Sequence, residues 1–262
     1  SATTCYTAGT AAGAVVNPQT IFKTTDGGTS WSQMTTSTAL NELSCADEST
    51  CYAAGAGGIL FRTTDGFVSN TNLKVSITTS SLYATDCPVG TNTCYAAGDG
   101  GFIGKTTDGS TWTALTSGTA TNLRGITCPV DTVTCFAAGA SGIVLKTTDS
   151  GASWSSLASG SAVQFNDIAC QGDKNTCYIS GNNGTILKTS DSGTNWSTLT
   201  TGTTEAMNSI YCYPDDLTCI AVGSGGKIIK TIDGGSTWTA MISGVASTLR
   251  SIDCSDSSCF IS

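Results

Sequence analysis

The chain has 262 residues, of which 11 are Lys or Arg and 19 are Asp or Glu, so its net charge is −8, and it contains no histidine. Only 11% of its residues are charged, against roughly 25% in ordinary soluble domains, so solubility must come from Ser, Thr and Asn, which suggests a secreted or cell-surface protein. The acidic balance argues against nucleic-acid and anionic-membrane partners. No apolar run reaches the roughly 18 residues that a membrane span needs. The lack of histidine excludes triad hydrolases and ordinary zinc enzymes.

The first residues, SATTCYTAGT, lack the basic and then apolar layout of a signal peptide. As given, the chain carries no export signal, and an exported protein would have been processed or excised from a longer one. We expect residues 1–262 to form one domain, because single all-β domains commonly reach about 200–250 residues.

A hairpin motif of the form K/R-T-x-D-x-G-x-x-W recurs along the chain from Lys23 onward. Its aspartates follow one another at steps of 39 to 43 residues and are Asp26, Asp65, Asp108, Asp149, Asp191 and Asp233. All five tryptophans occupy the last position of the motif, at Trp31, Trp112, Trp154, Trp196 and Trp238, and the copy that starts at Arg62 lacks one. A period of about 40–45 residues is typical of β-propeller blades.

Two cysteines form a second signature of the repeat, with four to six residues between them. The pairs are Cys45/Cys51, Cys87/Cys94, Cys128/Cys135, Cys170/Cys177, Cys212/Cys219 and Cys254/Cys259. Facing positions of an antiparallel hairpin suit a disulfide, and each short loop would contribute roughly 2–2.5 kcal/mol in the chain-entropy model. Zinc would need C-x2-C spacing or histidine. We therefore predict one disulfide per unit and an oxidising compartment.

Cys5 is left without a mate in this scheme. Its mate lies before Ser1, or it forms an intermolecular bond, or it exchanges with Cys254 across a ring closure.

Each unit contains four short apolar runs rich in β-branched and aromatic residues, separated by Gly, Asp, Asn and Ser. This pattern predicts four antiparallel strands per unit and almost no helix. We predict an all-β propeller of four-stranded blades, with a solenoid as the alternative. Six blades are favoured, because the last strands would complete the first blade and hide its edges; seven blades fit if the chain is a fragment.

The aspartate hairpins are interpreted as structural. The carboxylate can accept backbone N–H groups of the turn, the glycine takes positive φ, and the tryptophan covers the turn. One aspartate per unit on separate hairpins cannot gather the six to eight oxygens that calcium requires. We expect no metal and no cofactor.

The T-x-D-x-G-x-x-W hairpins resemble the Asp-box, or BNR, repeats of sialidases, xyloglucanases, sortilin-type receptors and the propeller assembly factors of photosystem II. The spacing, and glycine pairs before the K-T-T-D strand as in Gly55 to Asp65, are most similar to the last group. The resemblance covers essentially the whole chain and implies a propeller, whereas it says little about activity because this repeat supports unrelated functions.

The resemblance to sialidases would require three converging arginines, and the chain has Arg62, Arg124 and Arg250 at positions that need not meet. The resemblance to xyloglucanases would require two acids across a cleft between two propellers. Arg124 and Arg250 occupy equivalent places in NLRGI and TLRSI and are candidate binding residues, with solvated surface charge as the alternative.

We therefore predict a non-enzymatic extracellular propeller that serves as a protein- or glycan-binding or structural module of a surface protein or assembly, without membrane insertion. One alternative is a glycoside hydrolase of sialidase or xyloglucanase type, suggested by the acids Asp99, Asp215 and Asp216; another is a self-assembling subunit of a filament or surface layer. The sequons at Asn183 and Asn195 are candidate glycosylation sites.

Overall fold

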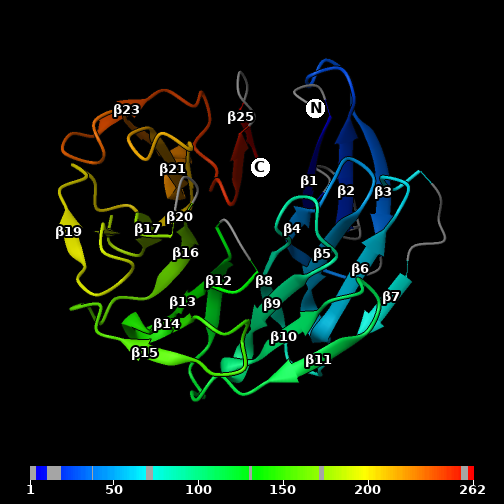
Figure 1. Cartoon of the computed structure of the whole chain (residues 1–262). Helices are drawn as coiled ribbons and strands as arrows, with labels where there is room; N and C mark the ends of the chain where they lie inside the picture. The colour runs from blue at the N-terminus through cyan, green and yellow to red at the C-terminus, as the bar shows by residue number, and fades with distance from the viewer. Residues whose placement is uncertain are drawn as a thin grey trace.

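The computed structural model describes residues 4–10, 19–36, 38–68, 73–129, 132–170, 174–254 and 259–262. Across these ranges the strands form small antiparallel sheets arranged around a centre (Figure 1). Helical structure in the same ranges is confined to 3-10 turns at Ala56–Gly58, Asp99–Gly101, Ala140–Gly142 and Ser224–Gly226. None of the helices described there has the length and apolar character needed to cross a bilayer.

The described residues form six blades, as predicted. Blade one has three strands, β1 (Cys5–Thr10), β2 (Gln19–Thr24) and β3 (Ser32–Thr36). The other five have four strands each, listed from the centre outward. Blade two is β4 (Leu40–Cys45), β5 (Cys51–Gly55), β6 (Ile59–Thr63) and β7 (Leu73–Ser76). Blade three is β8 (Leu82–Asp86), β9 (Cys94–Gly98), β10 (Ile103–Thr106) and β11 (Trp112–Leu115). Blade four is β12 (Leu123–Thr127), β13 (Cys135–Gly139), β14 (Val144–Thr147) and β15 (Ser155–Leu157). Blade five is β16 (Phe165–Ala169), β17 (Cys177–Gly181), β18 (Ile186–Thr189) and β19 (Ser197–Leu199). Blade six is β20 (Met207–Cys212), β21 (Cys219–Gly223), β22 (Ile228–Thr231) and β23 (Thr239–Met241).

The two ends of the chain do not join in one sheet, so the expectation that the last strands complete blade one was wrong. β24 (Ile252–Cys254) pairs with β25 (Cys259–Ile261), and this terminal hairpin lies between blades six and one (Figure 1). The ring of Phe260 meets that of Trp31 edge to face, with centroids 5.6 Å apart. Tyr52 meets Trp112 of the following blade in the same way at 5.9 Å. The hairpin therefore packs against blade one as one blade packs against the next.

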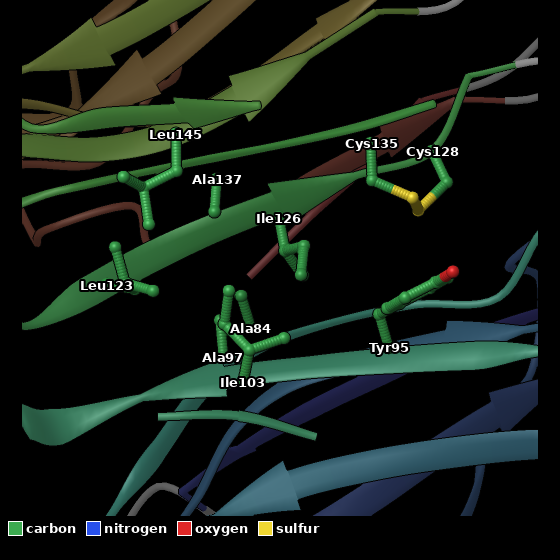
Figure 2. Packing of buried hydrophobic residues seen from close by; sticks show 10 residues of the cluster. All are labelled: Ala84, Tyr95, Ala97, Ile103, Leu123, Ile126, Cys128, Cys135, Ala137 and Leu145. Atoms are coloured by element: carbon green, nitrogen blue, oxygen red, sulfur yellow. A yellow bond between two sulfur atoms is a disulfide. The ribbon is translucent and has the colours of Figure 1, made fainter. Parts of the chain in front are cut away.

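Apolar side chains fill the space between neighbouring blades. Between blades three and four, Tyr95 and Ile103 face Leu123, Ile126 and Leu145 (Figure 2), and each of these side chains is at most 6% exposed. Burying a side chain of this size contributes about 1.5–3 kcal/mol. The core is thus a series of layers between the sheets.

A cationic side chain of the third strand adds a polar link to the next blade. Lys105 lies over the ring of Tyr95, with Nζ 5.3 Å from the centroid, and donates to the carbonyl of Ser150 in blade four at 2.8 Å. Lys146 and Lys188 repeat this arrangement over Phe136 and Tyr178, and donate to the carbonyls of Ser192 and Gly234. Each link combines a cation–π contact with a charge-assisted hydrogen bond.

The aspartate hairpins have the same internal hydrogen bonds in most blades. In blade four, Oδ1 of Asp149 accepts from the hydroxyl of Thr147 at 2.7 Å and from the amide of Ser153 at 2.9 Å. The Thr147 hydroxyl in turn accepts the amide of Gly151 at 2.9 Å. The Ser153 hydroxyl also donates to Oδ2 of Asp149. The hydrogen bonds to Asp149, chiefly those from the side chain and the amide of Ser153, lower the pKa of this carboxyl to about 2. All partners lie within the same turn, which accounts for its recurrence as a local motif.

Six disulfides occur among the described residues, one in each of blades two to six and one in the terminal hairpin, as the sequence predicted. They join Cys45–Cys51, Cys87–Cys94, Cys128–Cys135, Cys170–Cys177, Cys212–Cys219 and Cys254–Cys259, with Cα atoms 4.0 to 4.3 Å apart. Cys5 carries a free thiol.

Candidate functional site

The innermost strands of the blades surround a central cavity of about 670 Å³. The strands β4, β8, β12, β16, β20 and β24 follow one another around it, each in contact with the next. The cavity also reaches Thr4–Ala8 of blade one and the disulfide turns at Cys45, Cys87, Cys128 and Cys170. It therefore extends from the centre of the ring toward the face that carries the disulfides.

Side chains of the innermost strands β4, β8, β16 and β20 bind the backbone of the innermost segment that follows. The carboxylate of Glu42 accepts the amide of Thr85 at 2.7 Å, and that of Asp167 accepts the amide of Ile210 at 3.0 Å. Asp86 accepts the amide of Cys128 in the same manner. Asparagine side chains act as donors in the same places. Asn41, Asn166 and Asn208 donate to the carbonyls of Leu82, Met207 and Leu249, respectively. In the described residues no innermost strand pairs with that of the next blade, so these side chains satisfy backbone groups that would otherwise be unpaired.

Six carboxylates line this cavity: those of Glu42, Asp86, Asp167 and Asp253 on the innermost strands, and those of Asp47 and Glu48 in the disulfide turn of blade two. Burial raises the pKa of the four on the innermost strands: that of Asp86 to about 6, and that of Glu42 well above its ordinary value, with Asp167 adding repulsion. Amides that donate to these carboxylates act in the opposite direction. The pKa of Asp86, at about 6, and that of Asp47, which hydrogen bonds from Ser49 lower to about 2, leave both carboxylates ionised at neutral pH, so the cavity carries negative charge and favours a cationic occupant. Within the described ranges no group of three or more side chains is arranged to hold a metal ion.

The inner edge of β1 also faces the cavity. β1 pairs with β2 along its full length, and among the described residues no strand pairs with its other edge. Burial, and then the neighbouring carboxylate of Asp253, raise the pKa of the Cys5 thiol at the start of this strand. Backbone donors and acceptors therefore line one wall of the cavity.

The arginines singled out from the sequence have separate surroundings. The guanidinium of Arg124 lies 4.6 Å from the ring centroid of Tyr83, and Arg62 donates to the hydroxyl of Ser110 in the next blade at 3.1 Å. Arg250 is exposed at the entry to β24, where its amide donates to the carbonyl of Ser262. Arg62 lies on the third strand of blade two, Arg124 on the first strand of blade four and Arg250 just before β24, and none of the three lines the central cavity.

The acids considered for glycoside hydrolysis also lie apart from the cavity. Asp99 is beside Tyr83 in blade three, and Asp215 accepts the amides of Leu217 and Thr218 in a turn of blade six. Neither these two nor Asp216 lines the cavity.

The two sequons differ in accessibility. Asn183 is exposed, with φ at 57°, in the turn after β17. Asn195 is also exposed, but its side-chain amide donates to Asp191 at 2.7 Å and so belongs to the aspartate hairpin.

The carboxylates of the cavity were missed by the sequence analysis. Glu42 and Asp167 hold the third place of their first strands, and Asp86 and Asp253 hold the fifth, the residue before the cysteine. Counting back from each first cysteine would have aligned these positions. That they face a common cavity follows only from the closed arrangement of the blades.

Comparisons with known proteins agree with this architecture. A family model described as photosynthesis system II assembly factor YCF48 matches residues 105–262. Among curated proteins, no sequence gives a significant match.

Solved structures provide a second comparison. One described as YCF48 bound to D1 peptide has a TM-score of 0.74 and 18% identity, over 100% of this chain and 85% of that one. YCF48 from Cyanidioschyzon merolae has a TM-score of 0.72 and 16% identity, over 92% and 85%. The GH74 xyloglucanase from Xanthomonas campestris has a TM-score of 0.69 and 12% identity, over 90% of this chain and 45% of that one. At these identities the likeness shows the fold alone.

The resemblance to the photosystem II assembly factors is therefore confirmed by a family match that covers more than half of the chain. The protein belongs to the family of the photosynthesis system II assembly factor YCF48.

Proposed function

We propose that this propeller is a non-enzymatic module that binds a basic, extended protein segment in its central cavity. The observation that carries the proposal is the set of six carboxylates that line the cavity, those of Glu42, Asp47, Glu48, Asp86, Asp167 and Asp253. A concave site of about 670 Å³ is within the usual size range of ligand pockets. A structurally similar protein described as bound to a D1 peptide supports a peptide as the class of ligand.

We further propose that the module acts in an oxidising, extracellular compartment as part of a larger surface protein or assembly. Six disulfides support the compartment. Exposed Arg250 is a candidate contact for an acidic group of the partner, whereas Arg124 is engaged with Tyr83.

A glycoside hydrolase has less support. Its two carboxylates would face one cleft about 5–9.5 Å apart, one as acid and the other as nucleophile or base. Here Glu42, Asp86 and Asp167 accept backbone amides of the next blade, so all three serve as hydrogen-bond acceptors in the fold. The xyloglucanase comparison covers 45% of that enzyme, which leaves more than half of the enzyme without a counterpart.

Titration calorimetry with matched basic and acidic peptides tests the proposal. Basic peptides should bind more tightly than acidic ones, with affinity that falls as salt rises. Asp253→Asn should weaken binding about three- to tenfold, because Asp253 lines the cavity and, among the described residues, accepts from no following inner strand. Glu205→Gln is the matched control, since it removes one exposed charge outside the cavity.

Equal binding of acidic and basic peptides, or equal loss in Asp253→Asn and Glu205→Gln, would refute the proposal. Turnover of sialyl or β-glucan substrates abolished by one acidic substitution would instead support an enzyme. A concentration-dependent assembly that buries more than about 1,000 Å² at a repeated contact would support the filament alternative.

A further inference from the structure

Tryptophan side chains close the outer end of three of the interfaces between blades. Each comes from an aspartate hairpin and lies against the same buried cluster as the leucine that ends the fourth strand of the preceding blade. The pairs are Leu115 and Trp154, Leu157 and Trp196, and Leu199 and Trp238. An indole ring is therefore a regular part of the layer between two blades.

The aspartate hairpin of blade two has no tryptophan, and it has a phenylalanine at a glycine position. In the motif, Asn70 holds the place of the tryptophan and Phe67 holds the place of Gly151. The amide of Phe67 donates to the hydroxyl of Thr63 at 2.8 Å. The amide of Gly151 makes the same bond, to Thr147, at 2.9 Å. With φ at 60°, Phe67 has a left-handed backbone conformation that is strained for a bulky residue.

Phe67 replaces one contact of the missing tryptophan. Its ring meets that of Tyr6 in blade one edge to face, with centroids 5.9 Å apart, and its side chain is 8% exposed. In the next blade Trp112 makes this contact with Tyr52, also at 5.9 Å. The strained backbone of Phe67 therefore places an aromatic wall in this interface, and strained residues concentrate at binding sites.

A pocket of about 380 Å³ lies between blades one and two, beside Phe67 (Figure 1). Met34 in its wall holds the place in β3 that Leu115 holds in β11, so the pocket adjoins the position that accompanies a tryptophan at the other interfaces. A cavity of about 150 Å³ already holds benzene, and this pocket has room for an indole. Its described lining shares no residue with the central cavity.

The lining combines apolar walls with one cation. Ile21, which is 1% exposed, and Phe67 supply apolar surface. Lys23 is the one charged side chain among the described lining residues, and its ammonium donates to the carbonyl of Gly66 at 3.0 Å. A cation attracts the electron-rich face of an aromatic ring, and that of tryptophan most strongly. Gln33 brings a side-chain carbonyl that can accept an indole N–H.

We propose that this pocket binds the indole side chain of a tryptophan from a partner polypeptide, in the place that the hairpin tryptophan takes at three other interfaces. The inference goes beyond the proposed function, because the site is separate from the central cavity and takes an aromatic rather than a basic group. A tryptophan seated in a pocket commonly supplies much of the binding energy of a protein interface.

Fluorine NMR tests the site without interference from the five tryptophans of the protein. The probe is a pentapeptide with blocked ends and a central 5-fluorotryptophan between glycines. The unlabelled tryptophan peptide should displace it, and the peptide with leucine instead should compete at least about tenfold more weakly, because it lacks the ring area and the cation–π contact. The methyl signals of Ile21 and Met34 should shift on binding.

Val68→Asp places a carboxylate at the rim of the pocket. Val68 is 77% exposed, so the fold should be kept. The charge, partly desolvated beside the bound ring, should weaken binding at least about fivefold. Val245→Asp is the matched control, since it makes the same change at a valine that is 51% exposed and lies outside the pocket, and it should leave the affinity unchanged.

Asn70→Trp restores the motif of the other hairpins. The introduced indole should compete for the pocket, so binding of the probe should be lost. The unfolding temperature should rise, because more apolar surface is buried at the interface, and this rise shows that the variant is folded.

Equal competition by the leucine and tryptophan peptides, or equal loss in Val68→Asp and Val245→Asp, would overturn the inference. Tighter binding of free indole than of the tryptophan peptide would overturn the polypeptide in favour of a small aromatic ligand. Val68→Asp should leave the binding of basic peptides unchanged, and Asp253→Asn should leave the binding of the tryptophan peptide unchanged, so the failure of one proposal is distinguishable from the failure of the other.

Discussion

Threonine 147 is as central to its aspartate hairpin as Asp149 is. Its hydroxyl donates to Oδ1 of Asp149 and accepts the amide of Gly151 at 2.9 Å. The side chain is 2% exposed, so water cannot replace these bonds. The same threonine recurs as Thr24, Thr63, Thr106, Thr189 and Thr231.

We expect Thr147→Val to lower the free energy of unfolding by about 1–3 kcal/mol, because valine keeps the shape but leaves the buried amide of Gly151 without an acceptor. Urea denaturation of the oxidised protein measures the change. Thr148→Val is the control, since Thr148 is the exposed neighbour in the same strand end. Equal effects of the two substitutions would contradict the assigned role.

The two sequons also differ in the hydrogen bonding of their asparagine side chains. Transfer of a glycan requires a free asparagine amide on the surface. Asn183 is exposed, whereas the amide of Asn195 donates to Asp191. Expression in a host that glycosylates sequons should therefore give one glycan, lost in Asn183→Gln and kept in Asn195→Gln when measured by intact mass. Full occupancy of Asn195 would show that its hairpin opens before modification.

Residues of local motifs could be predicted from the sequence, and residues of the cavity could not. The partners of Asp149 are its own turn neighbours, so the spacing of T-x-D-x-G-x-x-W implies the geometry. The partner of Asp167 is the amide of Ile210, 43 residues away. No pattern within one repeat indicates that relation, which depends on how neighbouring blades are placed.

Between elements, the lysine links join the third strand of one blade to the aspartate hairpin of the next. Nζ of Lys146 donates to the carbonyl and to the hydroxyl of Ser192, at 2.8 and 2.7 Å, over the ring of Phe136. Lys230 holds the same place in blade six, but the terminal hairpin that follows has only two strands among the described residues and no aspartate hairpin.

Lys146→Met should therefore lower the free energy of unfolding by about 1–2 kcal/mol, through loss of the hydrogen bonds to Ser192 and of the cation–π contact. Lys230→Met makes the same chemical change without those partners and should have a much smaller effect. Chemical denaturation of both variants gives the comparison. A loss in Lys230→Met as large as that in Lys146→Met would show that the stabilisation comes from elsewhere.

The order of the blades was predictable because each repeat encodes its own strands. The way in which the ring closes was not predictable, because the terminal strands could either share one blade or occupy neighbouring positions of the ring. CFIS at Cys259 and CYTAG at Cys5 both have the sequence of a second strand, and only one such strand fits in a four-stranded blade. The contact between Phe260 and Trp31 shows that the two belong to neighbouring positions of the ring.

Across the whole molecule, two sets of carboxylates respond to pH in opposite directions. Hydrogen bonds within the hairpins lower the pKa of Asp26, Asp149 and Asp233 to about 2. Burial raises the pKa of Asp86 to about 6 and also raises that of Glu42, Asp167 and Asp253. The first set stabilises the fold when ionised, and the second set costs stability when ionised.

Stability should therefore be greatest near pH 4–5. As pH falls from about 4 through 2, protonation of the hairpin aspartates removes their contribution, because their folded pKa lies below the unfolded value of about 3.9. As pH rises from about 4 through 6, the unfolded state has already lost the protons that the buried carboxyls of the folded state still hold, so the free energy of unfolding falls. For Asp86, whose folded pKa is about 6, the fall is at most about 3 kcal/mol, at 1.4 kcal/mol per pKa unit. Urea denaturation between pH 2 and pH 8 measures the curve, and Asp86→Asn should flatten only its rising-pH side. A maximum at pH 7 or above, unchanged in Asp86→Asn, would mean that the carboxylates of the cavity are ionised in the folded protein without penalty.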